Sequence, residues 1–337
     1  MVSTLTPPAR VARNRRRIVI VVAALLAVAA LVGLFWVGLP SSVGSRAWFY
    51  SLDRLGRYGV GILLVSVAVG VSTVLFHTIT QNRILTPSLM GFDAMYMLIQ
   101  TAIVYFFFTG GAIAAGGLAG GGLSGFLVQT AIMVVVSTSL YLWLLSGRRN
   151  DIHLLLLVGI VIGVLFRSIG SLFQRLLDPA AYLLVQDALF ASFRSVQWDV
   201  LAACALIVVA CVALVAWQGP RLDVMLLGRD RAITLGVDHR RMMIGILIVV
   251  SLLVSASTVL VGPVLFFGLI VANAAYALLG SSLHRYTLPV ACLLGVIALA
   301  GGEIFIRTAG ISATLSIVIE FVGGLLFLYL ILSNRTR

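Results

Sequence analysis

The sequence contains few charged residues, which make up 10% of its 337 residues, whereas apolar residues account for 61%. A soluble domain needs far more charge to cover its surface, so that class of protein is excluded. Lysine is absent, and all 23 basic residues are arginines. The chain therefore has neither the P-loop lysine of a nucleotide hydrolase nor an amine for Schiff-base chemistry. If ATP drives this protein, another subunit must hydrolyse the ATP.

Cysteine is also scarce. Cys204, Cys211 and Cys292 all fall in apolar stretches and lack the spacing of a metal site, so we interpret them as packing residues. The sequence has no paired His, Asp or Glu motif and no nucleophile elbow. It therefore predicts no catalytic residue, no metal ligand and no cofactor bound by this chain.

Long apolar runs are abundant. About 20 apolar residues span a bilayer as a helix, and continuous rather than alternating runs favour helices over a barrel. The pattern predicts an all-α polytopic membrane protein with ten transmembrane helices, at 18–39, 58–79, 89–108, 124–146, 152–174, 197–217, 242–261, 263–279, 287–307 and 312–333. Because ten is an even number, both termini are expected on the same side of the membrane.

The arginines indicate the orientation. The net charge of +12 could indicate a nucleic-acid partner, but arginines of membrane proteins gather in cytoplasmic loops. With the N-terminus inside, sixteen arginines fall in inner segments, six fall in outer segments, and Arg167 lies within a span. We therefore expect a multi-pass protein of the cytoplasmic (plasma) membrane with both termini in the cytoplasm and no nucleic-acid partner. Residues 1–17 form a basic cytoplasmic tail, and residues 18–337 form a single transmembrane domain.

Three loops differ from the other, short connections. The segment 110–125 contains eight glycines and no charge, as a flexible connector does. The segment 175–198 lies outside and predicts a short helix at the membrane surface or re-entering the protein. The longest inner loop, 218–241, mixes charged and apolar residues with helix stops at Gly228 and Gly236, which predicts short amphipathic helices. Such a segment either lies on lipid or docks on a partner.

A short internal repeat links two predicted spans. Residues 66–75 have the pattern Ser-x5-Ser-Thr-Val-Leu, and residues 251–260 repeat it. In the predicted topology the two spans run in opposite directions. Inverted repeats of this kind are common in transporters.

Several segments carry a resemblance to a known family. QNRILTPSLMG (81–91), RDRAITLGV (229–237) and GPVLFFGLIVANAAYALLG (262–280) resemble, in order and spacing, signatures of iron-siderophore and vitamin B12 permeases of the FecCD type. LTPSLMGFDAMY (85–96) and LFASFRSVQW (189–198) are most similar to the catecholate-siderophore branch, which includes petrobactin- and anguibactin-type importers. Asn273 and Ala274 stand where the family often has Pro-His, and Leu325 stands where proline is frequent.

The resemblance implies a ten-helix permease subunit with the type II ABC importer fold and its inverted repeats. Two permeases, as a heterodimer or a homodimer, surround one path above a dimer of ABC ATPases that bind ATP and Mg²⁺. A siderophore-binding protein delivers the ferric siderophore, which crosses by ATP-driven alternating access, so the chain is not an enzyme. Haem or cobalamin as cargo remains open. So does a proton-coupled secondary transporter that uses Glu303, Glu320 and Asp93 as relays.

The resemblance also assigns roles to individual residues. Four residues match the segment that couples the permease to the ATPase: Asp230, Ala232, Leu235 and Gly236. Arg54, Arg57 and Arg307 match arginines that bind glutamates of the binding protein. The alternatives are a loop that lies on lipid, arginines that snorkel to the interface, and an ion pair of Arg307 with Glu303 one turn earlier.

Two charged residues within spans are possible pathway residues. Arg167 is costly inside a membrane and is expected to face protein or water, where a cation would attract an anionic ferric catecholate. Glu320 lies in a span that borders the path in the family. For both residues, a packed polar contact or a contact between permeases is the alternative. Asp93 near the start of a span complements the helix dipole.

Overall fold

The computed structural model describes residues 9–40, 43–108, 122–145, 152–190, 192–193, 196–310 and 314–334, and all of its regular structure there is helical. Seven helices are long and apolar enough to cross a membrane. They are α1 (Ala9–Gly38), α2 (Arg46–Thr80), α4 (Leu123–Leu145), α5 (Ile152–Leu176), α7 (Trp198–Met225), α9 (His239–Val261) and α11 (His284–Thr308). The prediction of an all-helical membrane protein is confirmed.

Shorter helices complete the bundle. Three of them are apolar: α3 (Phe92–Ile103, continued by the π-helical turn η2, Val104–Phe108), α10 (Phe267–Leu279) and α12 (Leu315–Asn334). The others are the 3₁₀ turn η1 (Pro87–Met90), α6 (Pro179–Leu189) and α8 (Arg229–Thr234). Each of the ten predicted spans overlaps one helix. The number ten depends on α3, α10 and α12, which are shorter than the other spans.

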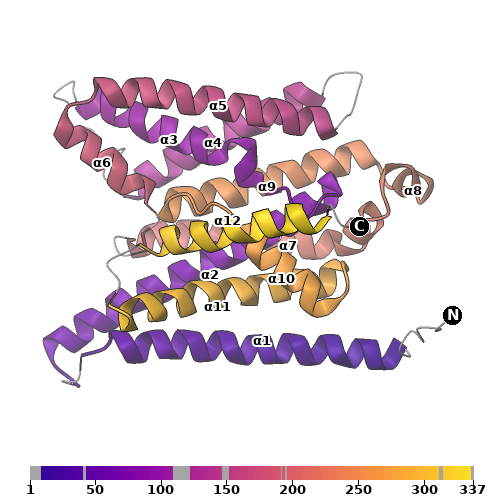
Figure 1. Ribbon diagram of the computed structural model, residues 1–337, viewed down its shortest axis with the longest axis horizontal. Coiled ribbons are helices and arrows are strands. Elements are labelled where there is room, and N and C mark those ends of the chain that lie inside the picture. Colours follow the sequence, from indigo (N-terminus) through magenta and orange to yellow (C-terminus); the bar gives the residue numbers. More distant parts are fainter. Residues whose placement is uncertain are drawn as a thin grey trace.

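The long helices lie side by side along one direction (Figure 1). Helix α1 begins and α12 ends at the end of the bundle where α8 lies, and α6 lies at the opposite end. We call these the α8 end and the α6 end. The first described residue of α1 and the last described residue of α12 thus lie at the same end of the bundle.

Helices α2 and α9 form the centre of the bundle. In the most apolar stretch of each, 72% of the residues are buried, against 17% in α1 and in α5. Small residues allow α11 to approach α2 closely, because a Cβ on Gly70 would lie 3.3 Å from the backbone of Ala291. The burial of α2 and α9 makes them the framework on which the other helices pack.

Glycine permits the break between α2 and α3. Helix α2 ends at Gln81 in the left-handed conformation, and η1 follows with Pro87 in its first turn. Gly91 then has a φ of 91°, and a Cβ there would lie only 2.7 Å from the Cα of Gly163 in α5. A larger residue would strain the backbone and separate α3 from α5.

The helix boundaries differ most from the predicted spans at three places. Helix α2 begins at Arg46, twelve residues before its predicted span, so Arg54 and Arg57 lie within the helix. Helix α1 begins nine residues before the predicted span, within the segment expected to be a tail. Helix α7 continues to Met225, through Pro220, because Leu222 and Met225 are buried against the body of the protein. The predicted short helix between 175 and 198 is α6, and Asp178 caps it by accepting from the Ala181 N–H at 2.8 Å. Most of the glycine-rich connector (109–121) and residues 1–8 of the tail lie outside the described residues.

Candidate functional site

Short amphipathic helices were predicted within 218–241, and the structure has one of them, α8, because the segment up to Met225 continues α7. Gly228 precedes it with a φ of 91°, and Gly236 follows it with a φ of 81°. The Val237 N–H donates to the Ala232 carbonyl and the Gly236 N–H donates to the Ile233 carbonyl, both at 3.0 Å. These two bonds form a Schellman motif, whose left-handed residue is Gly236. Gly236 is therefore confirmed as a helix stop, whereas Gly228 is the N-cap at which α8 begins.

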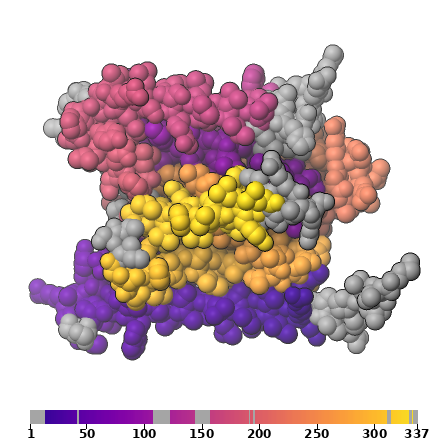
Figure 2. Space-filling view, viewed as in Figure 1, coloured from indigo at the N-terminus to yellow at the C-terminus, as the bar shows by residue number. Residues whose placement is uncertain are grey.

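The faces of α8 differ sharply. Ala232 is fully buried and attaches the helix to the bundle, where α8 contacts α7 and α9. Asp230 is exposed, and the apolar side chains of Leu227, Ile233 and Leu235 are 48%, 52% and 60% exposed. Figure 2 shows α8 projecting at the edge of the molecule. The structure thus brings the four predicted coupling residues together in α8 and the turn after it, a small protruding element whose outer surface carries both charged and apolar side chains.

The predicted docking arginines lie at the α6 end, and two of them are paired within the chain. Arg57 forms an ion pair with Asp53 at 2.8 Å, and its Nη1 donates to the Val196 carbonyl at 3.4 Å. Asp53 also accepts from the Trp198 indole N–H at 2.8 Å. These contacts fasten the start of α2 to the start of α7, so Arg57 has a structural role.

Arg307 forms the intrahelical ion pair that was the alternative to docking a partner. It forms an ion pair with Glu303 at 2.8 Å, and its guanidinium lies over the ring of Tyr58, 5.5 Å from the ring centre. Glu303 is almost fully buried, so Arg307 compensates a costly charge. Arg54, by contrast, is exposed and makes no hydrogen bond or ion pair with the residues that the structure describes. Of the three arginines, Arg54 is the best placed to bind a partner.

Arg167 and Glu320 lie on different helices but act on the same buried acid. Asp93 is 7% exposed, and its carboxylate oxygens have no hydrogen-bond partner among the described residues. Both Glu320 of α12 and Arg167 of α5 interact electrostatically with it. Arg167 is exposed and Glu320 is half-buried. Helices α5 and α12 both reach the face seen in Figure 2, with a recess between them.

One part of the exposed surface of α5 is polar for a membrane helix, although other exposed side chains such as Leu157 and Val161 are apolar. Arg167, Ser168, Ser171 and Arg175 lie on it together with Val164 and Leu172. The equally exposed helix α1 instead presents apolar side chains such as Leu25 and Trp36. Because arginine in contact with lipid is unfavourable, this face of α5 is suited to water or another protein rather than lipid.

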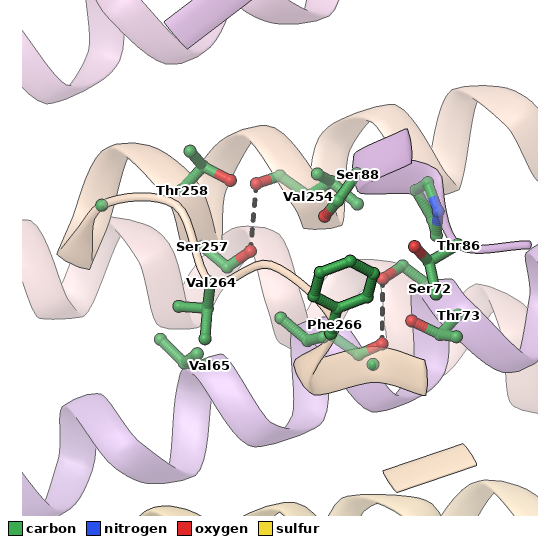
Figure 3. A pocket seen from close by; sticks show the side chains of 14 residues that line it. Val65, Ser72, Thr73, Thr86, Ser88, Val254, Ser257, Thr258, Val264 and Phe266 are labelled. Carbon is green, nitrogen blue, oxygen red and sulfur yellow. Dashed lines mark hydrogen bonds between the residues drawn. The ribbon is translucent and has the colours of Figure 1, made fainter. Parts of the chain in front are cut away.

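The internal sequence repeat forms a shared polar cavity at the centre of the bundle. Ser72 and Thr73 of α2 and Ser257 and Thr258 of α9 line a space of about 20 Å³, room for about one water molecule (Figure 3). Ser72 donates to the Val69 carbonyl at 3.1 Å, and Ser257 donates to the Val254 carbonyl at 3.0 Å. The two repeats therefore have the same local geometry and face each other.

The two repeats also run in opposite directions. The start of α2 contacts the segment before α7 through Arg57 and Val196, and the end of α9 contacts it through the Ser192 N–H, which donates to the Val261 carbonyl at 2.7 Å. Opposite ends of the two helices therefore meet at one place. This arrangement is the one expected of an inverted repeat.

Arg83 is a residue that the sequence pattern did not single out. Its guanidinium donates to Ser282 at 2.8 Å and lies 4.5 Å from the ring centre of Tyr276. Its carbonyl accepts from the side chain of Asn273 at 3.0 Å. Asn273, which departs from the Pro-His pattern, therefore leaves α10 continuous and links it to the loop after α2.

The fold and these sites define a helical membrane transport protein. Residues 53–333 match the model of the FecCD transport family, and the chain belongs to that family. It is 38% identical over 312 residues to the petrobactin import system permease protein YclO of Bacillus subtilis, covering 91% of this chain and 97% of that protein. It is 33% identical to the permease protein FatC of the Bacillus anthracis petrobactin import system, covering 96% of this chain and 91% of the relative.

More distant proteins share the fold. The vitamin B12 import system permease protein BtuC of Vibrio cholerae is 26% identical, over 90% of this chain and 89% of its own length. Among solved structures, an inward-facing metal-chelate type ABC transporter superposes with a TM-score of 0.76 at 19% identity, covering 94% of this chain and 99% of that chain. The resemblance to the FecCD family drawn from three sequence segments is thus confirmed over most of the chain.

Proposed function

We propose that this chain is the permease subunit of an ABC importer that carries a ferric siderophore, of the catecholate type, across the cytoplasmic membrane. Membership of the FecCD family and the two petrobactin import permeases among its relatives support this cargo. Haem and cobalamin are the alternative cargoes, and more distant relatives import vitamin B12 and hemin.

The observation that carries the mechanism is the exposed apolar side chains in and beside α8. Ile233 within this six-residue helix, Leu227 before it and Leu235 at its C-cap are all exposed, and such a segment is suited to fit a partner's groove. The chain lacks lysine, and hence a P-loop, so ATP with Mg²⁺ binds a separate pair of ATPase subunits. Closure of those subunits pushes on α8, and the permease alternates between outward- and inward-open states.

Topology follows from the same proposal. The seven long helices and the three shorter apolar helices together cross the membrane ten times. The excess of arginine in the predicted inner segments supports an orientation with the α8 end and both termini in the cytoplasm and the α6 end outside. The binding protein then docks at the α6 end, where Arg54 is exposed. Arg57 and Arg307 contribute by positioning that surface rather than by direct contact.

The transport path lies between this permease and a second one, which we expect to be a different chain. The polar face of α5 is then covered by protein and water instead of lipid. Arg167 attracts the anionic ferric catecholate, and Glu320 on the other side of the recess prevents the cargo from being held too tightly. A proton-coupled mechanism is less favoured, because Glu303 is already paired with Arg307.

Transport by reconstituted protein tests the proposal. The permease, its partner permease, the ATPase and the binding protein are placed in proteoliposomes with a radiolabelled ferric catecholate siderophore. We expect uptake that requires ATP and the binding protein and that a protonophore leaves unchanged. Uptake driven by a proton gradient without ATP would contradict the proposal, and a preference for haem or cobalamin would overturn the assigned cargo.

A further inference from the structure

Three polar side chains from three helices meet at the α8 end, where two of them are buried and Asp223 is partly exposed. The Asp223 carboxylate on α7 lies 2.7 Å from Nδ1 of His284 on α11, and the same oxygen accepts the His284 backbone N–H at 2.9 Å. Nε2 of His284 lies 2.8 Å from the hydroxyl of Thr78 on α2. His284 and Thr78 are each 1% exposed. We refer to Thr78, His284 and Asp223 as the His284 network.

The chemistry of the three groups sets which group donates and which accepts each hydrogen bond of the His284 network. A carboxylate only accepts, so Nδ1 of His284 carries a proton and donates it to Asp223. In a neutral ring Nε2 then accepts, and the Thr78 hydroxyl, which also lies 2.9 Å from the Val74 carbonyl, shares its one proton between these two acceptors. Every polar group of the imidazole is therefore satisfied, which a buried ring requires. Satisfied networks of this kind hold their members in one arrangement.

The network is placed at the base of the coupling element. Asp223 lies in the last turn of α7, six residues before α8 begins. A second bond holds the same turn, because the side chain of Gln81 donates to the Met225 carbonyl at 3.2 Å. The turn that leads into α8 is thus bound both to the start of α11 and to the end of α2.

Helix α2 connects this point with the centre of the protein. Thr78 lies little more than a turn beyond Ser72 and Thr73, which line the cavity shared with α9. A displacement of α8 and the end of α7 therefore reaches α11 through His284 and the central helix α2 through Thr78, by hydrogen bonds rather than through a flexible loop. Apolar contacts alone would hold the end of α7 less specifically against α2 and α11, because they are not directional as hydrogen bonds are.

We propose that Thr78, His284 and Asp223 are positioning residues that transmit the motion of α8 to α2 and α11. The inference deepens the proposed function and rests on it. Loss of the network leaves the permease inserted and bound to its ATPase, but it raises the number of ATP molecules hydrolysed per siderophore imported. Coupling between distant sites commonly corresponds to factors of about 5 to 150, and we expect about a tenfold rise.

The sequence provides a matched pair of variants. Thr78→Val removes the hydroxyl that contacts His284 while preserving the shape of the side chain. Thr80→Val does the same two residues later, where the buried hydroxyl bonds only to backbone carbonyls of Phe76 and Asn82. ATP hydrolysis and siderophore uptake are measured together in proteoliposomes for both. We expect Thr78→Val to be uncoupled about tenfold and Thr80→Val to behave as the unmodified protein.

Asp223 provides a second measurement. Asp223→Ala removes the acceptor and is expected to uncouple, whereas Asp223→Asn keeps an oxygen acceptor and is expected to restore part of the coupling. Normal coupling in both Thr78→Val and Asp223→Ala would overturn the proposal, as would equal uncoupling by Thr80→Val. Failure of Thr78→Val to assemble while Thr80→Val assembles would also overturn it, since the network would then serve folding. If the unmodified complex shows no ATP-dependent uptake, the proposed function itself fails.

Discussion

Replacing Gly236 tests whether the shape of α8 matters for transport. Gly236 is the left-handed residue of the Schellman motif, with a φ of 81°, and a Cβ there would meet no atom within 4 Å. Any effect of a side chain is therefore backbone strain and not a clash. For a residue other than glycine, the left-handed conformation costs about 1–2 kcal/mol. Asparagine tolerates this conformation better than alanine, and valine tolerates it worst.

Backbone strain at Gly236 is expected to change the conformation of α8. A six-residue helix has almost no stability of its own, so the strain is expected to act directly on the docked geometry of α8. A penalty of 1–2 kcal/mol corresponds to a change of about 5- to 30-fold in an equilibrium. We therefore expect siderophore uptake per ATP to fall about fivefold or more in Gly236→Ala, further in Gly236→Val, and least in Gly236→Asn.

The assay compares uptake and ATP hydrolysis of reconstituted complexes, with membrane insertion measured by surface labelling. Gly245→Ala in α9 is the control, because its Cβ also meets no atom within 4 Å but its backbone is helical. Alanine there is expected to leave transport unchanged and to favour the helix slightly. Equal transport by the asparagine, alanine and valine variants at Gly236 would refute the claim that the conformation of α8 couples ATP hydrolysis to transport.

Three further substitutions probe the ion pair, the central helices and the outer surface. Arg307→Ala leaves the buried Glu303 unpaired and is expected to lower the free energy of unfolding by about 3 kcal/mol, which Glu303→Gln in the same chain partly restores, as thermal unfolding in detergent would show. Gly268→Ala places a Cβ against the Thr73 hydroxyl and is expected to destabilise by about 1–3 kcal/mol, with rescue by Thr73→Ala. Arg54→Glu is expected to weaken binding-protein affinity about tenfold or more without changing the melting temperature, because Arg54 is exposed.

A specific outcome would contradict each of these three predictions. An unchanged melting temperature in Arg307→Ala would mean that Glu303 is solvated. Equal destabilisation by Gly268→Ala and by Gly324→Ala, where a Cβ meets no atom within 4 Å, would remove the contact with Thr73 as the cause. Unchanged affinity of the binding protein for Arg54→Glu, measured by surface plasmon resonance, would exclude Arg54 from the docking surface.

The helices, the ends of α8 and one ion pair could be predicted, because each depends on residues that are close in the sequence. Apolar runs gave the helices, and Gly228 and Gly236 marked both ends of α8, because a left-handed residue is a property of a single position. The pairing of Glu303 with Arg307 could also be foreseen, since residues four apart share a helix face.

Features that depend on packing could not be read from the sequence. Pro220 argues for a helix end, yet α7 continues past it because burial of Leu222 and Met225 outweighs the lost backbone bond. Asp53 pairs with Arg57 one turn away, but its second partner, Trp198, is 145 residues distant. The His284 network likewise joins residues 61 and 206 positions apart, and no spacing rule connects them.

Cross-linking from the outer face of α8 tests the central claim most directly. Leu235, at the C-cap of α8, is 60% exposed. Trp36, near the end of α1, is 85% exposed but lies away from the α8 end and serves as the control. Leu235→Cys and Trp36→Cys are labelled with a short photoreactive cross-linker in the complex purified with its natural partners. An adduct with the ATPase from Leu235→Cys, and none from Trp36→Cys, is the predicted result. Absence of any ATPase adduct from Leu235→Cys, in a complex that still imports siderophore, would contradict the account.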